Sequence, residues 1–135
     1  DTTLGEGDVG YTIPAEFNLK LFHKRGVLAA ARDNNPAKAS SGCQFYIVQG
    51  KKFTDSSLNV VETRRLKRKI PEYEREVYKA IGGTPHLDQG YTVFGEVIKG
   101  MEVVDKIAAE PTNKRDRPLK DMRMKIRMKK RFLFF

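Results

Sequence analysis

The sequence Ala-Ser-Ser-Gly-Cys-Gln-Phe-Tyr-Ile occupies residues 39–47, and Leu-Asp-Gln-Gly-Tyr-Thr-Val-Phe-Gly follows at residues 87–95. Each stretch combines aromatic and β-branched residues with a neighbouring glycine or serine bend, which is the pattern of a short strand beside a turn. Each also carries polar side chains among the aromatic ones. Together they predict strands over residues 44–48 and 92–97.

The segments around these two stretches extend the β pattern. Residues 27–32 form a short, nearly all-apolar run that is too short for a helix, so we expect a strand buried on both faces. Residues 11–17 read as extended, with Pro14 holding them at an edge or in a loop. Residues 122–128 alternate methionine or isoleucine with arginine or lysine, and this period of two predicts a strand with one buried face.

Two helices are predicted in the middle of the chain, and they look inserted into the β framework. Asp55 or Ser56 can cap the first helix, and Pro71 suits the first position of the second. The pair Gly82-Gly83 supplies a stop. The predicted buried face of the second helix consists of residues spaced four apart, which are Tyr73, Val77 and Ile81.

Size and charge limit the classes of function. The chain has 135 residues, which suits one domain, and no apolar run approaches the roughly 18 residues of a membrane span. No signal peptide is visible. The 26 basic residues exceed the 17 acidic ones, giving a net charge of +9. This excess is compatible with nucleic-acid binding, but a solvated basic surface is the simpler interpretation, because the basic residues between 122 and 129 alternate with apolar side chains. Cys43 is the only cysteine, which rules out an intramolecular disulfide, and we expect a packed, inert thiol.

Four blocks, at residues 10–17, 26–32, 39–47 and 87–104, resemble cyclophilin-type peptidyl-prolyl isomerases in the same order, as in a bacterial subgroup with a helical insertion. The resemblance implies a mainly β fold. It is a closed antiparallel barrel, incomplete here at the N-terminus, with a capping helix near residues 101–109 and an inserted helical pair at about residues 54–83. Residues 1–135 would form the C-terminal portion of a single domain.

The activity implied by the resemblance is interconversion of cis and trans X-Pro peptide bonds, which assists protein folding. Rotation about an amide faces a barrier of about 18–20 kcal/mol. Because no bond is broken, the reaction needs no metal or other cofactor. It needs a slot for the proline ring and a donor that stabilises the twisted amide.

The resemblance also implies roles for individual residues. Gln44 would be an auxiliary catalytic residue whose amide binds the substrate backbone. Its principal partner, the family's catalytic arginine, lies on strands ahead of the matched blocks and has no counterpart here, so this chain alone is expected to lack it. The residues implied to bind substrate are Ala31, Arg32 and Asp33 as a main-chain edge, together with Gln44, Tyr46, His86, Leu87 and Tyr91.

The expected partners are proline-containing peptides and unfolded protein clients, with an N-terminal segment of the protein itself or a swapped second copy as further candidates. Two other functions stay open. One is a non-catalytic proline-peptide binding or holdase module, and the other, less favoured, is a basic nucleic-acid-associated protein. We expect a soluble protein of the bacterial cytoplasm or periplasm. Residues 132–135, Phe-Leu-Phe-Phe, have no assigned role.

Overall fold

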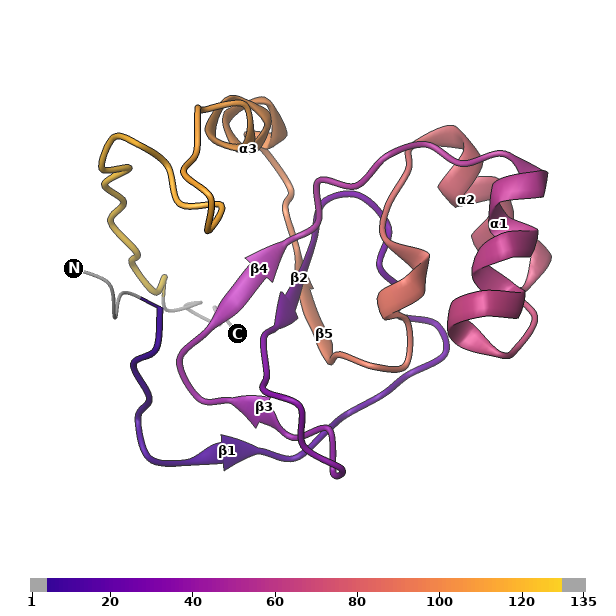
Figure 1. Cartoon of the computed structure of the whole chain (residues 1–135), viewed down its shortest axis with the longest axis horizontal. Coiled ribbons are helices and arrows are strands. Elements are labelled where there is room, and N and C mark those ends of the chain that lie inside the picture. The colour runs from indigo at the N-terminus through magenta and orange to yellow at the C-terminus, as the bar shows by residue number, and fades with distance from the viewer. Residues whose placement is uncertain (1–4, 130–135) are drawn as a thin grey trace, which may run out of the picture.

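The computed structural model describes residues 5–129, which form short strands and short helices (Figure 1). The residues before the first helix contain four strands, and one more strand follows the helical region. In chain order the elements are β1 (Thr12–Ile13), β2 (Val27–Ala30), β3 (Ser40–Ser41), β4 (Phe45–Ile47), α1 (Asp55–Val61), the π-helical turn η1 (Glu62–Leu66), α2 (Glu72–Ala80), the 3-10 turn η2 (Pro85–Leu87), β5 (Val93–Glu96) and α3 (Met101–Ala108).

The strands form two antiparallel sheets. One pairs β1 with β3, and the other has the order β4-β2-β5. Ala29 at the centre of β2 lies opposite Tyr46 on one side and Val93 on the other. The predicted antiparallel β framework is therefore confirmed. Within residues 5–129 the two sheets do not close into a barrel.

The core of the larger sheet lies on one face. Val27, Ala29, Val48 and Val93 are buried there, and Tyr46 packs against them. The two faces of β2 are unequal, because its alternate residues are only partly covered. The prediction of a strand buried on both faces is therefore wrong for β2.

The opposite face of this sheet exposes large aromatic side chains. Phe45 on β4 and Phe94 on β5 are 46% and 57% exposed, and their rings meet edge to face with centroids 6.4 Å apart. β4 and β5 are also the two edges of the sheet. An apolar face and two unpaired edges thus lie together.

Helices α1 and α2 pack side by side at one end of the structure (Figure 1). The start of α1 differs from the prediction, because Thr54 is the cap and forms a capping box with Ser57. Gly82, with φ of +87°, follows α2 as predicted, since this backbone conformation favours glycine. Leu58, Ile70 and Tyr78 form the buried cluster of this region.

The face of α2 that packs inward is not the predicted one. Tyr73 and Ile81 are 53% and 46% exposed, whereas Glu74, Arg75 and Tyr78 are buried. The charged side chains can be buried because they find partners. Arg75 donates to Glu62 at 2.9 Å and to Asp55 at 3.0 Å. Apolar periodicity alone therefore identified the wrong stripe.

The C-terminal part of the described chain contains one confirmed and one wrong prediction. Helix α3 forms as expected, although none of its residues is buried, so its apolar face covers no core. Residues 122–128 form no strand, and their apolar side chains are exposed, with Met124 at 77% and Ile126 at 68%. A strand needs main-chain hydrogen bonds to a neighbour, and residues 122–128 make none to another part of residues 5–129. Residues 132–135 lie outside the described part of the chain. No helix between residues 5 and 129 is long and apolar enough to cross a membrane.

Candidate functional site

The stretch Ala31-Arg32-Asp33 follows β2 directly, and only its middle residue keeps a free main chain. The Ala31 N–H donates to the Gln44 carbonyl at 2.9 Å, and the Ala31 carbonyl accepts from Ser41 at 2.8 Å. The Asp33 carbonyl accepts from Asn35. The Arg32 N–H and carbonyl have no hydrogen-bond partner among the described residues. Among the described residues, the main-chain groups of this stretch without a partner are therefore the N–H and carbonyl of Arg32 and the N–H of Asp33.

The Arg32 side chain is fixed over an aromatic ring. Its Nε donates to the Gly90 carbonyl at 2.7 Å, and its guanidinium carbon lies 4.6 Å from the centre of the Tyr91 ring. Tyr91 in turn meets Tyr46 edge to face, with centroids 5.9 Å apart and an angle of 81°. The structure thus brings the rings of Tyr46 and Tyr91 and the guanidinium of Arg32 together in one cluster, the aromatic group.

The Tyr46 hydroxyl belongs to a buried polar network that holds the side chain in place. Its hydroxyl lies 3.0 Å from His23 Nε2, and His23 Nδ1 lies 2.9 Å from Asp88 Oδ1. The second Asp88 oxygen accepts from the Tyr78 hydroxyl of α2 at 2.6 Å. Burial raises the pKa of the Tyr46 phenol above its ordinary value, so this side chain stays a neutral hydroxyl.

His23 was not among the residues predicted for the site. It is isolated in sequence, and its partner Asp88 is 65 residues away, so no local pattern reveals the pairing. The only indication in the sequence is a histidine within a largely apolar connector. The His23 side chain is nevertheless one of the least exposed in the described chain, at 1%.

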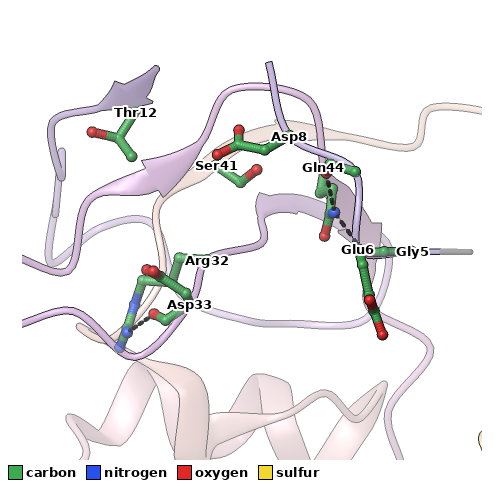
Figure 2. Close-up of a pocket in the computed structure, with 9 residues that line it drawn as sticks. Gly5, Glu6, Asp8, Thr12, Arg32, Asp33, Ser41 and Gln44 are labelled. Carbon is green, nitrogen blue, oxygen red and sulfur yellow. Dashed lines mark hydrogen bonds between the residues drawn. The ribbon is translucent and has the colours of Figure 1, made fainter. Parts of the chain in front are cut away.

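Gln44 lines a pocket that neither Tyr46 nor Tyr91 lines. Its side-chain amide donates to the carbonyls of Gly5 at 2.9 Å and Gly7 at 3.2 Å. These groups line a pocket of about 290 Å³ that also receives Arg32 and Asp33, which lie across from Gln44 (Figure 2). Tyr46, His86, Leu87 and Tyr91 do not line this pocket. The predicted residues therefore fall into a polar part around Gln44 and an aromatic part around Tyr46, with Arg32 in both.

His86 and Leu87 lie on the turn η2. Leu87 is partly buried, and its N–H donates to the Thr84 carbonyl at 3.0 Å. His86 is exposed, and desolvation together with the nearby Arg65 charge lowers its pKa. The carboxylate of Asp88, the residue after η2, also accepts the His23 N–H at 2.8 Å. This bond fixes the end of the turn beside the aromatic group.

Cys43 departs from its prediction. The thiol is exposed rather than packed, with the Ser41 hydroxyl at 3.9 Å and the Gly7 carbonyl at 3.8 Å. Among residues 5–129, no group of three or more His, Cys, Asp or Glu side chains is placed to hold a metal ion. The groups that the site does offer are a free main-chain donor and acceptor, aromatic walls and a side-chain amide. These groups can bind a peptide.

Comparison with known proteins identifies a family that matches this chain. The family described as "Cyclophilin type peptidyl-prolyl cis-trans isomerase/CLD" matches residues 2–128. Proteins named "Putative peptidyl-prolyl cis-trans isomerase" from Staphylococcus haemolyticus, Staphylococcus epidermidis and Staphylococcus aureus are similar to this chain. Each is 34% identical over 118 residues, which cover 87% of this chain and 56% of the relative. The chain thus spans about half the length of these curated relatives.

Proposed function

The chain belongs to the cyclophilin-type peptidyl-prolyl cis-trans isomerase family, and we propose from this premise that it binds X-Pro segments of unfolded or flexible proteins and takes part in their cis-trans isomerisation. Uncatalysed exchange takes tens to hundreds of seconds and can limit folding. A site that binds the twisted amide more tightly than either planar form accelerates the exchange.

The observation that carries this proposal is the free main chain of Arg32 beside two tyrosines. The open N–H and carbonyl of Arg32 can pair with the residue before the proline, as in a short β-augmentation. Tyr46 and Tyr91, in edge contact, would form walls of the proline slot, with Leu87 as a further wall and His86 at the rim.

Gln44 is proposed as the auxiliary catalytic residue. Its amide lies in the pocket that Arg32 also enters, so one extended peptide can reach both residues. The amide would exchange its bonds to the Gly5 and Gly7 carbonyls for bonds to the substrate backbone, and would hold that backbone while the prolyl bond rotates. The principal donor of the family is an arginine, and we assign that role to no residue of this chain.

We also propose that the two sheets belong to a barrel that further strands complete. The support is the exposed Phe45–Phe94 face with its unpaired edges β4 and β5. These strands would come from another segment of the protein or from a second copy. Binding of a dye specific for apolar surface tests this proposal. The dye should bind this chain alone and should be displaced when the added strands cover the Phe45–Phe94 face.

The function is tested by catalysed exchange of an Ala-Pro peptide. The chain is measured alone and fused to the unmatched part of a staphylococcal relative, with circular dichroism to establish folding. Acceleration that falls in Gln44→Ala supports the isomerase. Peptide binding without acceleration in either form supports instead a proline-peptide binding module, which the Arg32 edge alone could provide. A folded fusion that neither binds nor accelerates contradicts both.

A further inference from the structure

A groove of about 620 Å³ lies between the helical insertion and the segments on either side of it. One wall is formed by α1 and η1, and the other by residues 49–51 and 83–86. Phe53, Val60 and Val61 contribute apolar surface, and Val60 is 49% exposed although it belongs to a well-packed helix. The groove thus offers apolar contact to a ligand.

The charges around the groove are of one sign. Lys51, Arg64 and Arg65 line it together with His86, and none of its lining residues is acidic. No ion pair involves Lys51, Arg64 or Arg65 within residues 5–129. These exposed cations therefore have no compensating anion in the structure.

The acids of α1 and η1, the elements that form one wall of the groove, are engaged elsewhere. Glu62 binds Lys69 and Arg75, and Asp55 binds Arg75 and Lys79. The π-helical geometry of η1 presents Arg64 and Arg65 to the groove, and π-helical turns are frequent at functional sites. The positive potential of the groove is therefore not neutralised by its own helices.

The groove and the proposed proline slot share the turn η2. His86 lines the groove and Leu87 follows it on the same turn, and both α1 and η1 pack against that turn. The carboxylate of Asp88 fixes the end of the turn to the His23 main chain. A peptide whose proline lies beside Leu87 can therefore extend past His86 into the groove.

We propose that this groove selects substrates that carry acidic residues next to the X-Pro bond. This inference rests on the proposed function and names the substrate class for that site. The occupant is an acidic peptide segment with some apolar character. Its carboxylates would pair with Lys51, Arg64 and Arg65, and its apolar side chains would contact Phe53 and Val60.

The test uses three labelled peptides of equal length with a central Ala-Pro, flanked on both sides by two Glu, two Gln or two Lys residues. Fluorescence anisotropy gives affinities at low and high salt. Each exposed ion pair contributes little, but the Glu peptide can form several at once. We therefore expect it to bind on the order of tenfold more tightly than the Gln peptide at low salt. The preference should shrink at high salt, because salt screens exposed charges.

The decisive variant is Arg64→Glu/Arg65→Glu, and the matched control is Arg123→Glu/Arg127→Glu. Both change the net charge equally, but the control residues lie outside the groove. The first variant should lose or reverse the preference, and the control should keep it. Lys51→Glu serves as a second groove variant if the double variant does not fold.

Several outcomes would overturn the inference. Equal affinities for Glu and Gln peptides refute it while leaving the proposed function intact, because the neutral peptide still binds. Absence of binding and of exchange for all three peptides refutes the proposed function itself. An equal loss of preference in the control variant assigns the effect to overall charge. Tighter, Arg64-dependent binding of a single-stranded oligonucleotide assigns the groove to nucleic acid.

Discussion

His23 lies against Tyr46 with the two rings nearly parallel, at an angle of 15° and a centroid separation of 6.1 Å, and its Nε2 atom lies 3.0 Å from the Tyr46 hydroxyl. Because the Asp88 carboxylate accepts at Nδ1, the neutral tautomer with a proton on Nδ1 leaves Nε2 to accept from Tyr46. A buried imidazole thereby sets the position of a proposed substrate-binding ring.

Replacing His23 should destabilise the protein more than removing the Tyr46 hydroxyl. Tyr46→Phe loses one hydrogen bond, with a cost of about 1 kcal/mol, whereas His23→Phe also removes a partner from buried Asp88 and should cost about 2–4 kcal/mol. Urea unfolding of both single variants and the double variant measures this. Additive costs would contradict a direct coupling between the two side chains.

Glu74→Gln should stabilise the protein at neutral pH. The Glu74 carboxyl is 1% exposed, its Oε2 has no partner among the described residues, and burial with the Asp88 charge raises its pKa above the ordinary 4.5. A raised folded-state pKa favours folding below 4.5, and this contribution is lost as the pH rises through the folded-state pKa.

Urea unfolding of Glu74→Gln at pH 7 and pH 4 checks this sign. The variant should gain on the order of 1 kcal/mol at pH 7, since it removes an unpaired buried charge, and little at pH 4. A loss of stability at pH 7 would mean that the ionised carboxylate is satisfied. Glu72→Gln, on the exposed side of the same helix, is the control.

Glu62→Gln should have the opposite pH dependence. The Ile70 N–H, with Lys69 and Arg75, holds the pKa of the Glu62 carboxyl below its ordinary 4.5. A depressed folded-state pKa stabilises above 4.5, and this contribution is lost as the pH falls through the folded-state pKa. The variant should lose about 1–3 kcal/mol at pH 7.

The acid limb of the unfolding curve is the measurement for Glu62. The difference between the wild-type chain and Glu62→Gln should narrow as the pH falls below 4.5 and the wild-type carboxyl takes up its proton. Glu76→Gln, which breaks the exposed pair with Lys79, should change stability little. A constant difference down to pH 2 would show that packing rather than charge accounts for the loss.

Leu58→Ala should cost about 2–5 kcal/mol, because Leu58 is fully buried against Ile70 and Tyr78. Val60→Ala, two residues along the same helix, should cost much less, since Val60 is half exposed. Thermal unfolding followed by circular dichroism compares the two. Similar losses in both variants would contradict the greater contribution assigned to the buried Leu58 side chain.

The sequence predicted those elements whose pattern is local. Aromatic and β-branched residues identified β4 and β5, and Gly82-Gly83 identified the end of α2. The predictions were wrong where burial or strand formation depends on partners that are distant in the sequence. Arg75 is buried because Glu62 and Asp55 meet it from another helix, and residues 122–128 alternate correctly but have no neighbouring strand.

The site shows the same division. The resemblance named Arg32, Tyr46 and Tyr91, which the structure brings into contact. Periodicity could not reveal His23, because the bond to Asp88 exists only after two segments 65 residues apart have folded together. The bonds that the Ala31 main chain and the Asp33 carbonyl make likewise exist only in the folded chain.

The Tyr78 hydroxyl on α2 donates to the carboxylate of Asp88, which lies between η2 and β5. Deleting residues 54–83 would therefore leave one Asp88 oxygen without its donor, so this segment cannot be removed without changing the polar network that holds Tyr46. A shorter connection between β4 and η2 would have to bring its own hydroxyl, or replace Asp88 and His23 together. In this chain α2 and the polar network around Asp88 therefore depend on each other.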